Sequence, residues 1–403
     1  MNVLFMTIGK MDNVEEHTIY CDLLRYFRDA GHSVYTISPY EKRTGLQTAY
    51  EEKNGIHMLH VRTGNVTGMV SLIEKGLAQL SIEPVFIKAI KKYYSNVKFD
   101  LVMYSTPPIT FCNAIEYVRR RDNAKTYLLL KDIFPQNAVD IGMMSKSGIK
   151  GILYKFFRNK EKKLYGLSDY IGCMSPANVE YVKQNNPEID EYKVEVCPNC
   201  IEVVDKSINE EERRYIRKKY DIPLEKKVFV YGGNLGKPQG IDFLIECLHS
   251  QENSKDNYFL IVGDGTEYGK IEKFVKDSNQ NNIRLMKRLP QEDYDTMVGA
   301  CDVGMIFLDH RFTIPNFPSR VLSYMQAKIP VLACTDPNTD IGRIIEEAGF
   351  GNGCESNDIK GFAECVGKIM QIQDVADKEW NYLNKYYSTK TGYDIIMLSL
   401  IHI

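Results

Sequence analysis

Glycines gather at the end of an apolar stretch near the middle of the chain, in VFVYGGNLGKPQGIDFLI, residues 228–245. The pattern predicts a strand that runs into a glycine-rich loop and then into a helix. Glycines let backbone N–H groups approach phosphate oxygens closely, and the free N–H groups of a helix start carry partial positive charge. Lys237 adds a full charge, but Pro238 follows it where the phosphate loop of an ATPase has Ser or Thr. We expect a diphosphate cradle of another kind, and an ordinary glycine-rich turn is the alternative.

A second candidate for anion binding lies in FTIPNFPSRVLSYMQAKIPVLA, residues 312–333. A loop with Pro and Asn leads to Ser319 and Arg320 at the predicted start of a helix. A guanidinium and free helix N–H groups in one place favour phosphate oxygens. For Ser319, a role as a helix cap is the alternative. The turn Gly263-Asp264-Gly265, at the end of another apolar run, is equally well explained as a tight turn.

Length and composition limit the classes of protein to consider. The 403 residues exceed one ordinary core and suit two domains of about 100–200 residues each. Hydrophobic residues make up 44% and charged residues 26%, which is typical of a folded globular chain. The net charge of -2 offers no general attraction for nucleic acid, so nucleic acid is not an expected partner. No apolar run predicts a membrane-spanning helix, and the first residues, MNVLFMTIGKMDN, predict a strand and not a signal peptide.

The ten cysteines are scattered through apolar stretches, which is typical of reduced core residues in a cytoplasm. Cys197 and Cys200 have the spacing of a metal or redox pair, yet no second pair of Cys or His accompanies them. We therefore expect no metal ion to be bound there.

Apolar runs and helical patterns alternate through both halves of the chain, which is typical of parallel sheets flanked by helices. The alternation restarts after residues 198–205, where we expect the domain boundary. The expected strands are residues 2–8, 33–38, 101–105, 126–130, 170–174, 228–231, 258–262, 283–286, 303–307 and 331–334. The expected helices are residues 16–30, 109–120, 149–167, 209–219, 241–248, 268–276, 293–298 and 319–327. Ligands of such sheets bind at the carboxyl ends of the strands.

Taken in order, GGNLGKPQG, GDGTEYGKIE, LPQEDY, CDVGMIFL and PSRVLSYMQAKIPVLA resemble the carboxy-terminal domain of the retaining family 4 glycosyltransferases. AGHSVYTISP, YSTPPITF and LLLKDIFPQNAV extend the resemblance over nearly the whole chain, nearest to members that build O-antigen and capsule repeats. The resemblance implies the α/β GT-B fold, in which two Rossmann-like domains face each other across a deep cleft. We expect an acceptor-binding domain at residues 1–200 and a nucleotide-sugar domain at 201–380. The helical segment 381–403 is expected to pack back on the first domain.

The resemblance also implies roles for individual residues. Asp132, in LLLKDIFPQ, is expected to be the base or positioner for the acceptor hydroxyl, with a structural cap ahead of Pro135 as the alternative. The nucleobase and ribose are expected near Arg288, Leu289 and Ser323. The residues expected to bind the donor diphosphate are Gly9, Gly233, Asn234, Gly236, Lys237, Ser319 and Arg320.

Two positions depart from the family pattern. Many members have two glutamates eight residues apart, the second of which grips the ribose, where this chain has Pro315 and Ser323. The usual glycine in the turn before Pro330 is replaced by Lys328 and Ile329. The identity of the donor and a carboxylate contact to its ribose therefore do not carry over from the family.

Residues 145–167, SKSGIKGILYKFFRNKEKKLYGL, combine apolar and basic side chains at helical spacing. Residues 84–94, PVFIKAIKKYY, are a second, weaker example of the same pattern. A basic amphipathic helix lies in a bilayer interface and attracts anionic headgroups, whereas a half-buried helix with solvated lysines is the alternative. We expect Lys150, Phe156, Phe157 and Arg158 to contact the acceptor or the membrane. The expected location is the cytoplasm, with peripheral attachment to the inner face of the plasma membrane.

The expected reaction moves one sugar, with retention of configuration, from a nucleoside diphosphate to a saccharide on a polyprenyl diphosphate carrier. UDP is the expected nucleotide, and a hexose or an N-acetylhexosamine the expected sugar. No metal or other cofactor is expected, because helix ends, Lys237 and Arg320 meet the charge of the diphosphate. A sugar-nucleotide epimerase of the same fold and a non-catalytic partner subunit are the alternatives.

Overall fold

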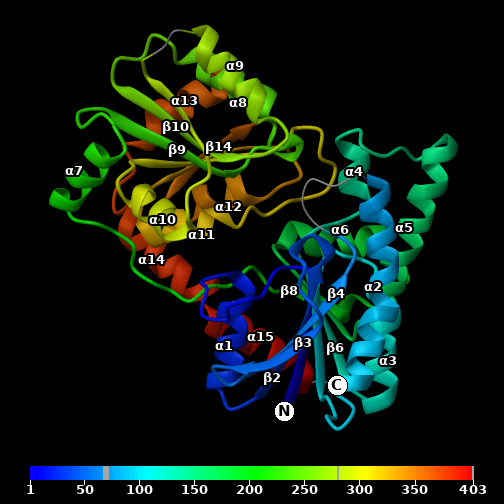
Figure 1. The fold of residues 1–403 in the computed structure, drawn as a ribbon. Helices are drawn as coiled ribbons and strands as arrows, with labels where there is room; N and C mark the ends of the chain where they lie inside the picture. Colours follow the sequence, from blue (N-terminus) through cyan, green and yellow to red (C-terminus); the bar gives the residue numbers. More distant parts are fainter. Residues whose placement is uncertain (67–71, 279–280, 402–403) are drawn as a thin grey trace. The chain divides into compact units, whose positions relative to one another are not determined.

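A computed structural model describes residues 1–66, 72–278 and 281–401, and the chain divides into two compact units (Figure 1). The first unit comprises Met1–Glu202 with Ser388–Ile403, and the second comprises Val203–Tyr387. Each unit has one largely parallel sheet with helices on both faces (Figure 1). The prediction of an α/β chain with two Rossmann-like sheets is therefore confirmed.

The sheet of the first unit has eight strands in the order β3-β4-β2-β1-β5-β6-β7-β8. All neighbouring strands are parallel except β3 and β4. The strands are β1 Asn2–Met6, β2 Ser33–Glu41, β3 Ala49–Lys53, β4 Ile56–Thr63, β5 Leu101–Ser105, β6 Lys125–Leu130, β7 Tyr170–Cys173 and β8 Val194–Val196. The helices are α1 Ile19–Asp29, α2 Leu72–Tyr93, α3 Cys112–Asp122, α4 Gln136–Asp140, α5 Gly148–Leu167, α6 Pro176–Asn185 and α15 Thr389–Ile401.

Helix α15 belongs to the first unit and packs beside α1 (Figure 1). Ile396 of α15 is fully buried in one core cluster with Leu24 and Phe27 of α1. The backbone N–H of Thr389 donates to the carbonyl oxygen of Ile201 at 2.9 Å. The chain therefore leaves the first unit and returns to it at adjacent points.

Several helices of the first unit differ from the prediction: α4 and α6 are absent from the expected helices, α3 is shifted by two or three residues at each end, and α1 and α2 begin elsewhere. Helix α1 was expected from residue 16, but the Thr18 hydroxyl accepts a hydrogen bond from the Cys21 backbone N–H (3.1 Å), so the helix begins after this cap. Its expected end holds, because Gly31 follows the helix with a φ of +87°. Of helix α2 only the second half was expected, as residues 84–94, since Pro84 stands inside the helix and proline normally interrupts a helical pattern.

The sheet of the second unit has six parallel strands in the order β11-β10-β9-β12-β13-β14. The strands are β9 Lys227–Asn234, β10 Asn257–Asp264, β11 Ile283–Met286, β12 Val303–Phe307, β13 Val331–Thr335 and β14 Gly351–Glu355. The helices are α7 Glu210–Lys219, α8 Ile241–Ser250, α9 Tyr268–Ser278, α10 Gln291–Gly299, α11 Arg320–Ala327, α12 Ile341–Glu347, α13 Ile359–Ile369 and α14 Val375–Tyr386. A short 3-10 turn, η3, spans Lys237–Gln239.

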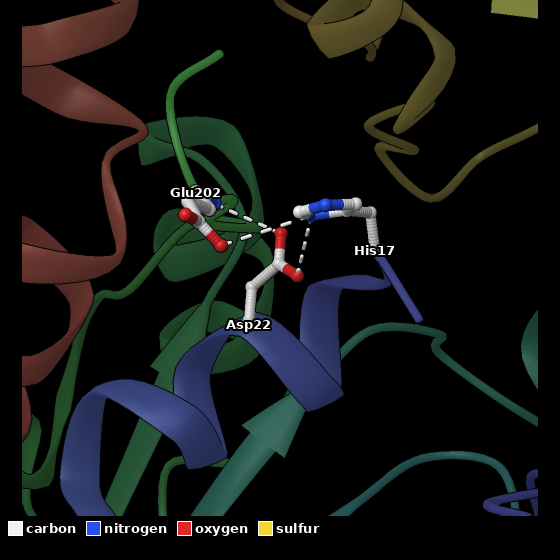
Figure 2. Close-up of side chains that lie close together, drawn as sticks. All are labelled: His17, Asp22 and Glu202. Atoms are coloured by element: carbon white, nitrogen blue, oxygen red, sulfur yellow. Dashed lines mark hydrogen bonds and ion pairs between the residues drawn. The ribbon is translucent and has the colours of Figure 1, made fainter. Parts of the chain in front are cut away.

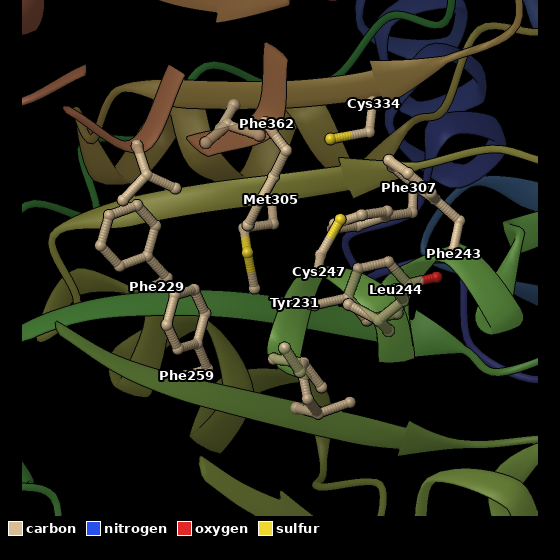
Figure 3. Close-up of a cluster of buried hydrophobic side chains, with 14 of the residues drawn as sticks. Phe229, Tyr231, Phe243, Leu244, Cys247, Phe259, Met305, Phe307, Cys334 and Phe362 are labelled. Atoms are coloured by element: carbon tan, nitrogen blue, oxygen red, sulfur yellow. The ribbon is translucent and has the colours of Figure 1, made fainter. Parts of the chain in front are cut away.

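The core of the second unit lies between the sheet and helices α8 and α13 (Figure 3). Phe229 and Tyr231 of β9 pack there with Met305 and Phe307 of β12 and Phe362 of α13. Residues two apart in a strand face the same side of the sheet, which places both members of each pair in this core. Burying one such side chain stabilises the fold by about 1.5–3 kcal/mol, so the strand ends above this core are held firmly.

The strand order of each sheet indicates where a ligand would bind. In the second unit the chain runs outward from β9 through β10 to β11, and outward on the other side from β12 through β13 to β14. In the first unit the corresponding reversal lies between β1 and β5. In open α/β sheets, ligands bind at the carboxyl ends of the strands where the order reverses. The loops after β1, β5, β6, β9 and β12 are therefore the segments to inspect.

Candidate functional site

The glycine loop after β9 is shaped by close backbone contacts with β10. A side chain on Gly263 would clash with the carbonyl oxygen of Gly233, so β10 requires glycine at this position. The backbone N–H of Leu235 donates to the carbonyl oxygen of Asp264 at 2.9 Å. Gly233 itself is exposed and has a φ of +125°, a conformation that residues with a side chain rarely adopt. The loop is thus fixed in one shape with its backbone open at Gly233.

The rest of the loop is closed by Gln239 of the 3-10 turn η3. Its side-chain oxygen accepts hydrogen bonds from Asn234 Nδ2 (3.2 Å) and from the backbone N–H of Gly236 (3.3 Å). Helix α8 begins where the sequence predicts, but η3 lies between it and the glycines. The N–H of Gly236 is therefore already in use, and Lys237, which is exposed, is the residue of η3 with a free charge for a ligand.

Arg320, the first residue of α11, lies beside the glycine loop. A methyl group on Gly233 would lie 3.5 Å from its Nη2 atom, and its Cζ atom is 4.2 Å from the ring centroid of Tyr231. Its Nη1 atom is buried and has no hydrogen-bond partner among the described residues. An unsatisfied buried polar group costs about 1–3 kcal/mol, and more when it is charged. This cost is removed if an anion binds, which makes the position suitable for a phosphate.

Strand order explains why Gly233 and Arg320 meet. Strands β9 and β12 are neighbours, and α11 follows β12 in the chain. Ser319 occupies the cap position of α11 and is exposed, but its side chain makes no capping hydrogen bond. Ser323, one turn into the helix, is half-buried. The capping alternative for Ser319 thus lacks the bond that would define it.

The two residues expected at the nucleobase lie farther along the same edge of the sheet. Arg288 and Leu289 follow β11, which is two strands from β9. Arg288 is exposed and Leu289 is half-buried. The structure therefore brings Gly233 and Arg320 into direct contact and places Arg288 and Leu289 at a separate position on that edge.

Two buried carboxylates at this edge were not among the predicted site residues. Asp309, after β12, accepts hydrogen bonds from Arg311 Nε (2.8 Å) and Nη2 (2.6 Å). Burial opposes its ionisation, but the bonds from Arg311 outweigh burial and lower the pKa of Asp309. Asp336, after β13, accepts a bond from the Thr339 hydroxyl (2.8 Å), yet burial raises its pKa to about 6. An acidic residue directly after an apolar strand, as in IFLD and ACTD, is the signal that finds both.

Asp293 and Asp295 of α10 stand two residues apart, a spacing at which carboxylates can share a divalent cation. Residues two apart on a helix do not face each other. Asp293 accepts a hydrogen bond from Lys219 Nζ at 3.0 Å, and Asp295 accepts one from Lys206 Nζ at 2.6 Å. Each carboxylate therefore has its own lysine, and the pair fits ion pairing within the second unit better than it fits a metal site.

Asp132 lies in the loop between β6 and α4 of the first unit and is half-buried. The Thr106 hydroxyl oxygen accepts bonds from the backbone N–H groups of Lys131 (3.0 Å) and Asp132 (3.2 Å), which fixes this loop. The Asp132 carboxylate accepts a bond from Asn137 Nδ2 at 2.6 Å. Removal from water raises the pKa of Asp132 to about 6, a value suited to proton transfer. Pro135 holds the cap position of α4 with no side-chain bond, so Asp132 is not its cap.

Gly9 lies in the loop after β1, at the switch point of the first sheet. Its backbone N–H donates to the Thr7 hydroxyl oxygen at 2.9 Å, and a side chain would lie 3.2 Å from that oxygen. Gly9 belongs to the first unit, whereas Gly233 and Arg320 belong to the second. Its contact with the donor diphosphate stays a prediction.

The first half of α5 leaves large apolar side chains in solvent. The exposed fractions are 88% for Ile149, 70% for Ile152, 49% for Leu153 and 41% for Phe156. Residues at this spacing share one face of a helix. Lys150 is exposed in the same segment. These four apolar residues, called the α5 apolar face below, form the largest exposed cluster of their kind in a single described helix.

Phe157 and Arg158, which the sequence groups with Lys150 and Phe156, are turned into the first unit. The Phe157 ring packs edge-on against Phe134 with the ring centroids 5.1 Å apart. The Arg158 side chain donates to the side-chain oxygens of Glu161 and Asn186. Of the four residues expected at an acceptor or membrane, Lys150 and Phe156 are therefore the two at the surface.

His17, Asp22 and Glu202 form a cluster with spacing that could hold a metal ion (Figure 2). Their ligand atoms all lie within 4.8 Å of one another. Arg25 Nη2, however, donates to Asp22 (2.7 Å) and Glu202 (2.9 Å) and lies 3.3 Å from His17 Nδ1. The backbone N–H of Glu202 also donates to Asp22 at 2.8 Å. Because a guanidinium already supplies the positive charge, the cluster is better explained as an ion-paired anchor for the end of the first unit.

Comparison with solved structures defines the class of fold. Sucrose-phosphate synthase from Thermosynechococcus elongatus is similar, with a TM-score of 0.77, 13% identity and 98% of each chain covered. HepE of Anabaena in complex with UDP has a TM-score of 0.70 and 15% identity over 100% of each chain. The chain has the GT-B fold of glycosyltransferases.

Sequence comparison adds the activity. Residues 212–386 match the family model described as Glycosyl transferases group 1. The chain is 26% identical over 303 residues to WbjE of Pseudomonas aeruginosa, named a glycosyltransferase, with 75% of this chain and 73% of the relative covered. It is 24% identical over 134 residues, 32% of each chain, to WcaI of Escherichia coli K12, named a colanic acid biosynthesis glycosyl transferase. The protein is therefore a glycosyltransferase.

None of the helices within the described ranges is long and apolar enough to span a bilayer.

Proposed function

We propose that this glycosyltransferase moves one sugar, with retention of configuration, from a UDP-sugar to a saccharide on a polyprenyl diphosphate carrier. The observation that carries the donor half is Arg320, whose buried Nη1 atom lacks a partner in the described part of the chain, beside the exposed Gly233. HepE was solved with UDP and with UDP-glucose, and WcaI is named for colanic acid biosynthesis. These likenesses support a UDP-sugar as donor and a surface polysaccharide as product.

The donor chemistry needs positive charge at one place. When the bond between the sugar and the diphosphate breaks, negative charge grows on the leaving phosphate oxygen. Arg320 and Lys237 would supply full charges there, and the open backbone at Gly233 would supply a dipole. A fixed donor of this kind contributes about 2.7–4 kcal/mol to transition-state stabilisation. We therefore propose turnover without a divalent cation.

The acceptor chemistry needs a proton acceptor. The attacking hydroxyl loses its proton as its oxygen bonds to the sugar carbon, and UDP leaves as the second product. Asp132 is the proposed base or positioner for this hydroxyl. With a pKa of about 6, its carboxyl group is about nine-tenths ionised at pH 7 and ready to accept a proton.

The lipid carrier would be met at the α5 apolar face. Soluble chains rarely leave such a cluster of large apolar side chains in water unless it marks an interaction surface. Lys146, Lys150 and Lys155 are exposed in the same segment and would attract anionic headgroups at about 1 kcal/mol each. Peripheral attachment to the inner face of the plasma membrane is therefore part of the proposal.

The proposed donor site is tested by thermal-shift assays and by assays of nucleoside diphosphate release with UDP-, GDP- and dTDP-sugars, each with and without EDTA. Stabilisation by one nucleotide family and EDTA-insensitive release of the nucleotide are the expected results. A changed sugar nucleotide released without acceptor would point to an epimerase. Binding without turnover under any acceptor would point to a non-catalytic subunit, and binding of none would refute the donor site.

The membrane half is tested by flotation with vesicles of anionic or zwitterionic lipid. Wild type is expected to float with the anionic vesicles, and Ile149→Ser/Ile152→Ser to bind at least about tenfold more weakly, because two apolar side chains lose their insertion energy. Tyr215→Ser, which changes an exposed aromatic residue on α7, is the matched control. Equal binding by all three proteins would exclude the α5 apolar face as the membrane contact.

A further inference from the structure

Tyr231 connects the glycine loop with Arg320. It lies on β9 and is fully buried among the core side chains that Figure 3 shows. Its hydroxyl group donates to the carbonyl oxygen of Asn234, in the loop, at 3.1 Å. The Arg320 Cζ atom lies 4.2 Å from its ring centroid. One side chain therefore contacts both parts of the proposed diphosphate site.

The contact with the ring leaves the hydrogen-bonding capacity of Arg320 intact. A guanidinium group has five N–H donors, and a carboxylate partner would take two of them in a bidentate pair. Attraction to an aromatic face is electrostatic and takes none of these donors. Nη1 has no hydrogen-bond partner in the described ranges, and Nη2 lies beside Gly233. The tyrosine thus holds the charge in place while its donors stay available.

The backbone that carries Arg320 is fixed separately by Tyr324, one turn later in α11. The Tyr324 hydroxyl lies 3.0 Å from the carbonyl oxygen of Met305 and 3.3 Å from that of Val230. These bonds tie α11 to β12 and β9. What remains free to vary is the direction of the long Arg320 side chain, and the ring of Tyr231 lies against its guanidinium group.

The hydroxyl of Tyr231 is kept in the form that the loop contact requires. Burial raises the pKa of Tyr231, although the charge of Arg320 opposes the rise. The hydroxyl therefore stays protonated and donates to Asn234. The ring contacts Arg320, and the hydroxyl group contacts the loop and also interacts with Arg320.

We infer that Tyr231 is a positioning residue for the donor diphosphate, whose ring directs Arg320 and whose hydroxyl fixes the glycine loop. The inference rests on the proposed function, because it requires that a nucleoside diphosphate binds at this loop. It goes beyond that proposal because it assigns a positioning role to Tyr231, a residue that contacts no substrate itself.

The test compares UDP with uridine, which lacks the diphosphate, by NMR titration of the full chain. Tyr231→Leu removes both tasks and is expected to weaken UDP binding about 10–30-fold, or about 1.4–2 kcal/mol, with uridine binding unchanged. Tyr231→Phe keeps the ring and is expected to weaken UDP binding at most about threefold. In an Arg320→Ala background, Tyr231→Leu should add little, since residues that act through each other are not additive.

Phe229→Leu is the matched control. Phe229 lies on the same strand and faces the same core, fully buried, but packs against Phe259. It is expected to leave UDP affinity unchanged, so a loss equal to that of Tyr231→Leu would overturn the inference as a core-packing effect. Should Tyr231→Leu not fold, Tyr231→Met takes its place, because the flexible methionine side chain adapts to gaps in a core and has no aromatic face.

The remaining outcomes of these titrations each decide between the positioning role of Tyr231 and its alternatives. Equal weakening of UDP and uridine by Tyr231→Leu, or additivity with Arg320→Ala, would overturn the positioning role. Loss of UDP binding in Arg320→Ala with normal binding in Tyr231→Leu would overturn this inference and leave the proposed function standing. If wild type binds no nucleoside diphosphate, the proposed function fails and the inference fails with it.

Discussion

Arg25 of the first unit and Arg320 of the second are both largely withdrawn from solvent, yet their surroundings differ. Arg25 donates to Asp22 and Glu202 through Nη2, and to the carbonyl oxygen of Val14 through Nη1 at 2.6 Å. Arg320 lies against the ring of Tyr231, and its Nη1 atom has no partner among the residues that the structure describes. Arg25 is saturated with acceptors, whereas Nη1 of Arg320 keeps its donors available.

This difference separates a structural charge from a binding charge. A buried charge is stable when hydrogen bonds and an opposite charge replace the water it has lost. Arg25 meets that condition within the chain, so its contribution is to folding. Arg320 does not, and the fold tolerates the cost at the one edge of the second sheet where a ligand is expected.

The largest expected effect on stability follows from removing the Arg25 side chain. Arg25→Ala leaves the buried Asp22 carboxylate without its cation, and we expect the unfolding free energy to fall by about 3–5 kcal/mol. Urea unfolding followed by circular dichroism measures this loss. Arg120→Ala, which breaks an exposed ion pair with Glu116 on α3, is the control and should cost about 0–1 kcal/mol. A loss for Arg25→Ala no larger than for the control would contradict the structural role.

Removing the Arg320 side chain should have the opposite effect: a large loss of turnover and no loss of stability. Arg320→Ala is expected to slow donor turnover about 100–1000-fold, because a preorganised donor to the leaving phosphate is lost. Its unfolding free energy should stay unchanged or rise, since an unpaired buried charge is removed. Arg320→Lys keeps the charge without the planar guanidinium group, and its donor turnover should lie between those of wild type and Arg320→Ala. A variant that loses stability but keeps full turnover would reverse the assignment.

Asp132 offers a pH test of a partly buried carboxyl in the first unit. Wild-type turnover should rise with pH through about 6 as the base ionises, and Asp132→Asn should be about 100-fold slower without this rise. Its pKa lies above the ordinary 3.8, so the folded chain binds this proton more tightly than the unfolded chain. The stability that the protonated Asp132 carboxyl contributes is therefore lost as the pH rises from 3.8 to about 6. Asp132→Asn should consequently be no less stable than wild type at pH 7, which thermal unfolding checks.

The smallest expected effects are on stability, at the starts of helices α1 and α11, where one hydroxyl makes a capping bond and the other does not. Thr18 accepts a capping bond from the Cys21 backbone N–H, whereas Ser319 makes no such bond. Thr18→Ala should lower the unfolding free energy by about 1 kcal/mol. Ser319→Ala should change it by less than about 0.5 kcal/mol. A capping loss at Ser319 equal to that at Thr18 would show that the hydroxyl supports the helix after all.

Much of the fold could be predicted because its signals are local. Apolar runs flanked by turns located most central strands of both sheets, and glycine after α1 marked the end of that helix. Strands β3 and β14 were missed, since exposed or glycine-containing strands lack a long apolar run. Strand β4 was missed because His57, His60 and Arg62 interrupt its apolar run. The first half of α2 was missed because Pro84 interrupts the helical pattern.

The site could be predicted only in part, for the same reason. Gly233 and Arg320 stand at a loop and a helix start, which the sequence marks directly. Tyr231 reads as one more core residue of a strand, because its contact with Arg320 depends on β9 and β12 being neighbours. The inward direction of Arg158 likewise depends on Asn186, a residue of a separate segment. Contacts between distant segments are what sequence patterns do not record.

The return of α15 to the first unit has a consequence for synthesis of the chain. Ile396 completes a core whose other members come from the first 200 residues, and the whole second unit lies between them. A ribosome produces the amino-terminal end first, so the second unit emerges and can fold while the first still lacks its last helix. During that interval α1 has an uncovered apolar face. The first unit begins to form first and is finished last.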